Sequence, residues 1–200
     1  MAPNRIMRGR AMRRALPLVA IATLVAATLL GCGGGGSSST AQQEREADAK
    51  VLNEILARQL AAVAAYGKVL PKLHGADLVT ARHFRAQEQE HVDATTKVLQ
   101  KTGAEADPPA ETIEANELKT REDALTFLYE MESATIDAEL HAIDRLNIGW
   151  PRPLLASMAA NQAQRLVLIR HALGAQPLAT VPEPFETGET PAPEGMMRNP

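Results

Sequence analysis

The sequence predicts an all-α protein, an antiparallel four-helix bundle with one long connection and flexible ends. Four stretches repeat apolar residues at steps of three and four, the spacing of one face of an α-helix, and no stretch alternates as a strand does. Pro71, Gly75, Gly103 and the corner 147–153 separate these stretches, because Pro and Gly interrupt helices. Four helices with one apolar stripe each can bury those stripes only against one another.

The four helices are expected at about residues 42–70, 76–101, 120–147 and 154–173. Thr120 should cap the third helix with Asp123 as its partner, and Gly174 should end the fourth. The bundle then occupies residues 42–175, with a long connection between the second and third helices. Residues 176–200 are rich in Pro, Glu, Thr and Gly, so we expect them to form a loose or disordered tail.

Residues 1–31 are typical of an export signal and are excluded from the fold. Five arginines precede an apolar run over residues 15–30, which is too short for a comfortable membrane span. Leu29-Leu30-Gly31-Cys32 resembles a bacterial lipobox, which would make Cys32 the lipid-carrying first residue of the mature chain. The alternative is an ordinary signal in which Cys32 is incidental. Because Cys32 is the only cysteine and stands at the expected position, the sequence favours the lipoprotein.

The composition after the leader favours an exported, membrane-tethered domain. Residues 32–41 are almost all Gly, Ser and Thr and predict a flexible tether on the extracytoplasmic side of the cell membrane. Loss of the leader removes five of the 21 Lys and Arg residues and leaves 16 against 24 Asp and Glu. This acidic balance argues against nucleic acid as a partner and is compatible with cation binding. Membrane lipid, bound through Cys32, is the one partner that the sequence indicates.

Every predicted helix also carries polar or charged residues on its apolar stripe, near its middle. These residues are Gln59 in the first helix, Glu88 and His91 in the second, Glu132 and Glu139 in the third, and Gln162 and Arg165 in the fourth. An unpaired buried charge is costly, so these groups must meet one another, a metal or water. The three-residue spacing of Glu88 and His91 puts a carboxylate and an imidazole on one helix face, which suits a metal.

On these residues the sequence resembles the ferritin-like superfamily, and in particular the exported ferritin-like domains of bacteria, over about residues 45–175. Such bundles hold two metal ions with a Glu from each of helices 1 and 3 and a Glu-x-x-His from each of helices 2 and 4. The resemblance implies three surviving ligands, Glu88, His91 and Glu132, with Glu130 as the alternative to Glu132 in a shifted register. It implies three lost ligands, at Gln59, Gln162 and Arg165.

Arg165 decides what this partial pattern means. A guanidinium stays protonated in proteins and cannot ligate a metal. We therefore expect Arg165 to take the place of the metal and to donate hydrogen bonds to Glu88, Glu132 or both, with Gln59 and Gln162 bridging. In the alternative, the Arg165 side chain extends outward to solvent and the glutamines are ordinary boundary residues.

Two functions follow from these two readings. With a degenerate dimetal site the protein carries no metal, is not an enzyme and has a structural or binding role. The alternative is a ferritin-like oxidoreductase that holds iron or manganese on Glu88, His91 and Glu132 and performs ferroxidase or peroxide chemistry. The catalytic residues and any protein partner are left open by the sequence.

Overall fold

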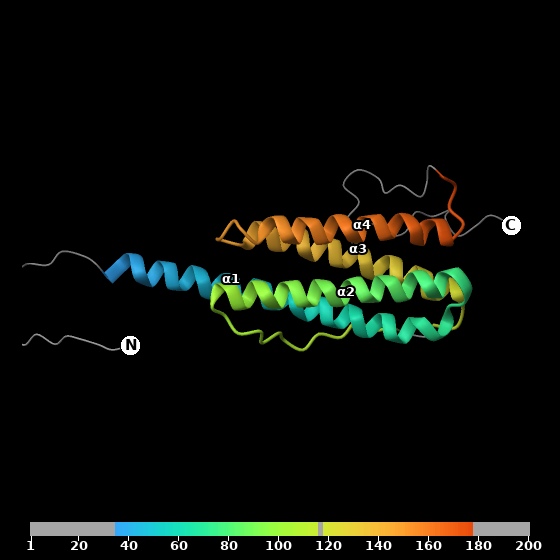
Figure 1. The fold of residues 1–200 in the computed structure, drawn as a ribbon, viewed down its shortest axis with the longest axis horizontal. Helices are drawn as coiled ribbons and strands as arrows, with labels where there is room; N and C mark the ends of the chain where they lie inside the picture. Colours follow the sequence, from blue (N-terminus) through green and yellow to red (C-terminus); the bar gives the residue numbers. More distant parts are fainter. Residues whose placement is uncertain (1–34, 116–117, 178–200) are drawn as a thin grey trace, which may run out of the picture. The chain divides into compact units, whose positions relative to one another are not determined.

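The computed structural model describes residues 35–115 and 118–177, and over this part of the chain the secondary structure is helical, without strands (Figure 1). The elements are α1 (Gly35–Val69), the short 3-10 helix η1 (Leu70–Lys72), α2 (Gly75–Thr102), α3 (Arg121–Arg145) and α4 (Arg152–Ala172). The predicted all-α four-helix bundle is confirmed. The export signal, Cys32 and residues 178–200 of the predicted tail lie outside the described residues.

The long connection between α2 and α3 sets the topology of the bundle. α1 and α2 form one antiparallel hairpin, and α3 and α4 form another (Figure 1). The connection returns along the length of the bundle, so α2 and α3 run in the same direction. Asn53 of α1 holds this connection, because its Nδ2 donates to the Glu105 carbonyl (3.1 Å) and its Oδ1 accepts from the Asp107 amide (2.8 Å). Each hairpin also packs on the other, mainly through α1 and α3, whereas α2 and α4 touch sparsely.

The helix ends follow the local signals in the sequence. Thr120 Oγ1 accepts from the Asp123 amide at 3.0 Å, and Asp123 Oδ2 accepts from the Thr120 amide at 2.8 Å, so the predicted capping box is present. The hydrogen bond from the Thr120 amide lowers the pKa of the Asp123 carboxyl. Gly103 and Gly174 end α2 and α4 in the left-handed region, with φ of 79° and 86°.

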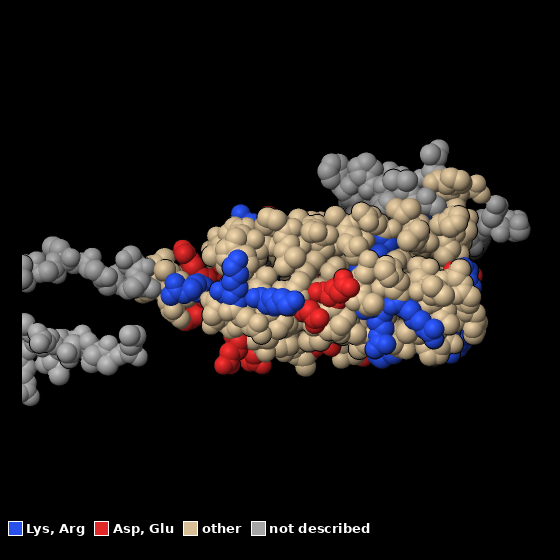
Figure 2. All heavy atoms as spheres, in the orientation of Figure 1, with Lys and Arg blue, Asp and Glu red and all other residues tan. Residues whose placement is uncertain are grey.

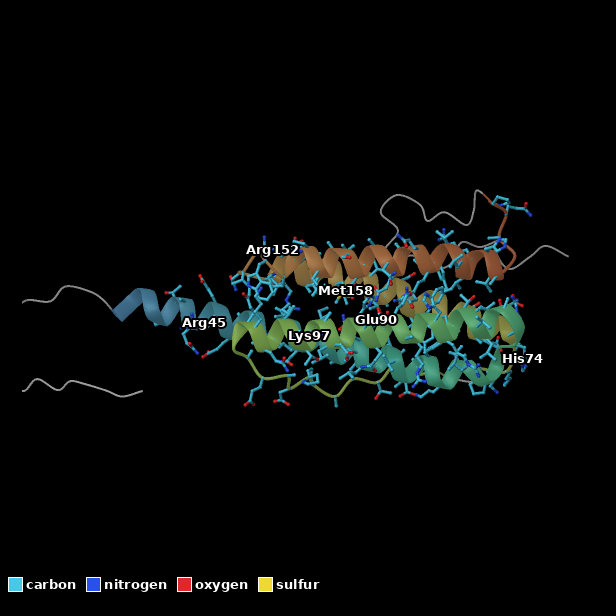
Figure 3. All side chains as sticks on the ribbon, in the orientation of Figure 1. Arg45, His74, Glu90, Lys97, Arg152 and Met158 are labelled. Carbon is cyan, nitrogen blue, oxygen red and sulfur yellow. The ribbon has the colours of Figure 1, made fainter. Side chains whose placement is uncertain are left out.

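The first helix differs from its prediction. α1 begins at Gly35, so residues 35–41 of the predicted tether are helical. Once the residues after Ala41 form a helix, each preceding residue adds a hydrogen bond without a new nucleation step. Arg45 lies on the part of α1 that extends past the end of the bundle opposite His74 (Figure 3). No helix within residues 35–115 and 118–177 combines the length and the apolar character needed to span a membrane.

Two apolar clusters fill the bundle, one on each side of a central polar layer. One cluster, near the α1–α2 turn, includes Tyr66, Phe84 and Leu128, and the other, near the α3–α4 corner, includes Leu52 and Leu99. These side chains lie on the apolar stripes of their helices and are buried. Trp150, between α3 and α4, is 44% exposed, and the Lys101 ammonium lies 4.1 Å from the centre of its ring.

Candidate functional site

All four helices contribute to the polar layer at the middle of the bundle. Six side chains in it are at most 1% exposed, namely Gln59, Glu88, Glu132, Glu139, Gln162 and Arg165. The sequence predicted each of these residues to face the core, because each lies three or four residues from an apolar residue of its stripe. Glu130, the alternative to Glu132, is exposed.

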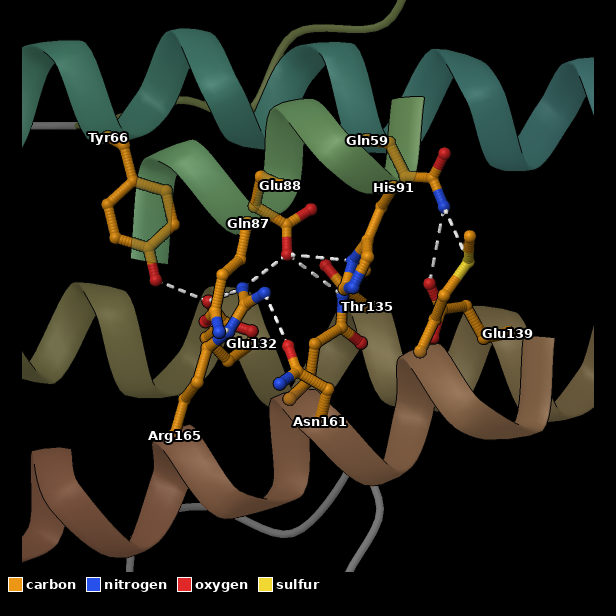
Figure 4. Close-up of polar contacts among 12 residues, drawn as sticks. Gln59, Tyr66, Gln87, Glu88, His91, Glu132, Thr135, Glu139, Asn161 and Arg165 are labelled. Atoms are coloured by element: carbon orange, nitrogen blue, oxygen red, sulfur yellow. Dashed lines mark hydrogen bonds and ion pairs between the residues drawn. The ribbon is translucent and has the colours of Figure 1, made fainter. Parts of the chain in front are cut away.

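Arg165 joins three helices at the centre of this layer (Figure 4). Its Nη1 donates to Glu88 Oε1 of α2 and, at 3.0 Å, to Glu132 Oε1 of α3. Its Nε donates to Gln87 Oε1 at 3.2 Å, and its Nη2 donates to Asn161 Oδ1 at 2.8 Å. All three guanidinium nitrogens therefore have acceptors, and Arg165 lies inside the bundle instead of extending to solvent.

Two further side chains complete what we call the Arg165 cluster, which consists of Tyr66, Glu88, Glu132, Gln162 and Arg165. The Tyr66 hydroxyl donates to Glu132 Oε1, and Gln162 Nε2 donates to Glu88 Oε1 at 3.2 Å. Gln162 thus contacts a carboxylate, as the sequence predicted. His91 Nδ1 lies 3.4 Å from Glu88 Oε1, near enough for an electrostatic interaction but without the geometry of a hydrogen bond.

Gln59 does not join this cluster, and the prediction that it bridges to Arg165 is wrong. Its Nε2 donates to Glu139 Oε1 and contacts Met158 Sδ, each at 3.4 Å. Glu139 lies seven residues after Glu132, or about 10 Å further along α3. Periodicity assigned Gln59 to the correct face of α1, but its partner lies at another level of the bundle.

Burial and charge set the protonation of the layer. Burial raises the pKa of Glu132 to about 7 even though Arg165 opposes the shift. Burial and the nearby Glu88 charge raise the pKa of Glu139 to about 9, so Glu139 is neutral at pH 7. For Glu88, burial is outweighed by His91 and Arg165, and its pKa is lowered. At neutral pH the cluster therefore holds an ionised Glu88 paired with Arg165.

The residues of the layer do not fit a dimetal centre. Arg165 Nη1 stands between the two carboxylates, where a bridging cation would have to lie. Burial alone would lower the pKa of Arg165, but Glu132 and Glu88 outweigh it and raise that pKa above its ordinary value. A dication beside this fixed charge would meet strong repulsion in a low dielectric. In the part of the chain that the structure describes, no three His, Cys, Asp or Glu side chains gather in an arrangement that could hold a metal.

Three polar residues near the site were missed by the sequence reading. Gln87 and Asn161 accept from Arg165 but lie on the flanks of their stripes, although the four-residue spacing of Asn161 and Arg165 was a usable signal. Arg170 is a second buried arginine, 1% exposed, and its Nη2 donates to the Tyr129 hydroxyl at 2.6 Å. No sequence pattern marked Arg170, because it stands one position beyond the stripe that ends at Ile169.

Comparisons with known proteins support the fold. No protein-family model matches the chain, and no curated protein matches it in sequence. A crystal structure described as ferritin like, diiron-carboxylate proteins from Bacillus anthracis str. Ames is similar, with a TM-score of 0.53 and 17% sequence identity. The similarity covers 64% of this chain and 96% of the other. At this level of identity the likeness shows the fold, which is ferritin-like.

Proposed function

We propose that this protein is a membrane-anchored lipoprotein with a ferritin-like bundle in which a guanidinium replaces the dimetal centre, and that its role is structural or in binding. The observation that carries the proposal is the pair of hydrogen bonds from Arg165 Nη1 to Glu88 and Glu132. Arg165 thereby joins α2 and α3, as a metal ion bridging the same two carboxylates would. Arg165 supplies this link without the open coordination positions that metal chemistry requires.

Metal analysis of the wild-type protein, purified without chelators, tests this proposal. We expect far less than one iron or manganese per chain. Near-stoichiometric metal that is lost in Glu88→Ala, but kept in Glu90→Ala, would contradict the proposal. Glu90 is the matched control because it lies on the same helix and is exposed (Figure 3).

A variant designed to restore metal binding tests whether Arg165 excludes the metal. Gln162→Glu with Arg165→His completes a second Glu-x-x-His on α4, and it replaces a fixed cation by a carboxylate and a neutral ligand. Added Mn²⁺ should raise the melting temperature of this double variant, because a ligand that binds only the folded state stabilises it. The wild type should show no such shift. A metal-induced shift in the wild type as large as that of the variant would refute the guanidinium's role.

A second candidate function rests on the outer oxygens of the two carboxylates. Glu88 Oε2, Glu132 Oε2 and His91 Nδ1 are buried and have no hydrogen-bond partner among the described residues. A reduced-site oxidoreductase would use these atoms as ligands of one divalent metal, although the described structure does not gather the three side chains into an arrangement that could hold it. Iron or manganese bound there would supply redox chemistry. The metal analysis separates the two functions, because only this candidate requires metal in the wild type.

The anchored location is proposed from the sequence around Cys32. Leu29-Leu30-Gly31-Cys32 supports lipidation, and the arginine-rich start with the apolar run over residues 15–30 supports export. Labelled fatty acid should be incorporated into the wild type and not into Cys32→Ala, which should leave the membrane fraction. Equal labelling of the two proteins would contradict the anchor.

A further inference from the structure

An open pocket with a basic lining lies between α1 and α2, outside the Arg165 cluster. Its volume is about 450 Å³, which falls within the range of pockets that bind small molecules. On the face in Figure 2, Lys and Arg side chains gather where α1 and α2 meet, toward the turn between these two helices. We call it the α1–α2 pocket, and its lining consists of Val63 and Leu70 of α1 and Arg82, Arg85, Ala86 and Gln89 of α2.

The two arginines of this pocket have no carboxylate partner among the described residues. Arg85 Nε donates to the Val63 carbonyl at 3.3 Å, which leaves Arg85 Nη1 and Nη2 without a partner in that part of the chain. Arg82 forms no hydrogen bond or ion pair there. Other surface arginines of the bundle each pair with a carboxylate, namely Arg58, Arg121 and Arg145. The pocket therefore carries two positive charges without a counter-charge, although the whole chain has more acidic than basic residues.

The spacing of Arg82 and Arg85 brings these charges together. Residues three apart on a helix lie on one face, with their Cβ atoms about 5–6 Å apart, and like charges at this spacing destabilise the helix. No Asp or Glu of the described residues lines the pocket. Asp93, which accepts from Gln89 Nε2 at 3.1 Å, lies eight residues, or about 12 Å, beyond Arg85 along α2. An anion held by both guanidiniums would remove the repulsion and supply the missing acceptors.

Gly67 leaves room on the α1 side of the pocket. It lies four residues after Val63 and three before Leu70, so the three residues share one face of α1. Glycine inside a helix is less favourable than alanine. Gly67 has no positive φ that would require glycine, and a Cβ added there would meet nothing within 4 Å. Neither the backbone nor the packing explains this glycine, whereas a ligand beside the two arginines would.

We propose that the α1–α2 pocket binds a phosphate monoester that carries an apolar group. Such a phosphate has close to two negative charges at neutral pH, which match Arg82 and Arg85, and a guanidinium can donate to phosphate through two parallel hydrogen bonds. Val63, Leu70 and Ala86 offer apolar contacts to the rest of the ligand. The site does not depend on the metal content of the bundle, because none of its lining residues belongs to the Arg165 cluster.

Calorimetry with phenyl phosphate tests this site in the full chain, in a Cys32→Ala background that excludes the proposed lipid anchor. Arg82→Gln with Arg85→Gln should weaken binding by about tenfold or more, because two charge-assisted contacts are lost. Arg45→Gln with Arg145→Gln is the matched control, because it removes the same charge from exposed positions outside the pocket. This control should leave binding unchanged.

Gly67→Leu separates loss of the ligand from loss of the fold. Leucine is a better helix former than glycine, so the melting temperature should rise. Binding of phenyl phosphate should nevertheless weaken, because the added side chain occupies space that the ligand needs. Unchanged binding in Gly67→Leu would contradict the position that we assign to the ligand.

Vesicles identify the source of the phosphate monoester, which is either a soluble metabolite or a lipid headgroup. Binding to phosphatidate vesicles over phosphatidylcholine vesicles, lost in the Arg82 and Arg85 variant, would support the site with a lipid as its ligand. Arginine-dependent binding of phenyl phosphate alone would support it with a soluble ligand. Binding of neither probe, or equal weakening by the control pair, would overturn the proposal.

Discussion

A buried guanidinium can serve as a structural cross-link when every nitrogen has an acceptor, and Arg165 meets that condition through four acceptors on α2, α3 and α4. Removing it would leave two carboxylates facing each other inside the core. Arg165→Ala should therefore lower the free energy of unfolding by about 3–5 kcal/mol. Arg165→Lys should recover only part of this stability, because a single ammonium cannot donate to all the acceptors that the planar guanidinium reaches. Urea unfolding measures both variants.

The control for Arg165 is an arginine on the surface. Arg145 Nη1 lies 2.7 Å from Glu54 Oε2, with both side chains substantially exposed. Arg145→Ala should cost at most about 1 kcal/mol, since exposed ion pairs contribute little. If Arg145→Ala proves as damaging as Arg165→Ala, the central role of the Arg165 cluster is refuted.

Glu139 makes the stability depend on pH. Its pKa is raised to about 9 in the folded state from an ordinary 4.5, so between these values the folded chain keeps a proton that the unfolded chain releases. Stability from this group is complete below about pH 4.5 and is lost as the pH rises toward 9, by at most about 1.4 kcal/mol per pH unit. Glu132, whose pKa is raised to about 7, also makes stability fall as the pH rises, but its contribution is lost by about pH 7. The interval from pH 7 to 9 therefore isolates Glu139.

Glu139→Gln should reduce the fall in the free energy of unfolding between pH 7 and 9, because glutamine does not titrate. The substitution keeps an acceptor for the Gln59 amide. Unfolding free energies measured at pH 7, 8 and 9 should fall less steeply in the variant than in the wild type. Glu90→Gln, on the exposed face of α2, should leave the slope unchanged. Parallel slopes for wild type and Glu139→Gln would show that Glu139 is ionised in the fold.

The sequence pattern predicted on which face of its helix each site residue lies, but not how far along the bundle it lies. The three- and four-residue spacing of Glu88, Glu132 and Arg165 gave their faces, and their opposite charges gave their partners. It did not give the level of a residue along the bundle, so Gln59 was assigned to the wrong partner. Gln87 and Asn161 lie beside their stripes, where the rotamer decides whether a side chain turns inward.

At the scale of the helices, local capping determined several boundaries. Thr120→Ala removes the acceptor of the Asp123 amide and should lower the free energy of unfolding by about 1 kcal/mol. Thr96→Ala is the matched control, because the Thr96 hydroxyl donates to the Val92 carbonyl within α2 and alanine has a higher helix propensity. The control should be neutral or stabilising. Equal destabilisation by both substitutions would argue against a role for the cap.

The helix boundary that was predicted wrongly, the start of α1, has no capping or stop residue in the sequence. The ends of α2 and α4 were predictable because Gly103 and Gly174 adopt a positive φ that other residues avoid. The start of α1 has no comparable stop. Weak helix formers after Gly35 can extend a helix that stronger residues have already nucleated, so propensity alone placed the boundary too late.

At the scale of the molecule, the long connection determines which helices can share the site. Because α2 and α3 run in the same direction, each neighbouring pair in the bundle remains antiparallel (Figure 1). The length of the connection was readable from the spacing between Gly103 and Thr120. Its path over α1 was not, since it depends on tertiary contacts such as the Asn53 hydrogen bonds.

The polar layer interrupts an otherwise apolar core and therefore affects the stability of the whole bundle. Buried ion pairs are often no more stabilising than well-packed apolar residues, although breaking one by a single substitution is costly. We therefore replace the whole Arg165 cluster at once, by Tyr66→Phe, Glu88→Met, Glu132→Leu, Gln162→Leu and Arg165→Met. This variant should keep the helical circular dichroism spectrum and be at least as stable as the wild type.

The single substitutions must behave differently for this prediction to hold. Glu88→Met and Arg165→Met alone each leave a buried charge without its partner, so their costs should add to far more than the cost of the combined variant, as expected for residues in one network. Thermal and urea unfolding of the set measure this difference. A combined variant less stable than either single one would mean that the polar layer is the main source of stability. A stable combined variant would instead show that the fold does not need these charges.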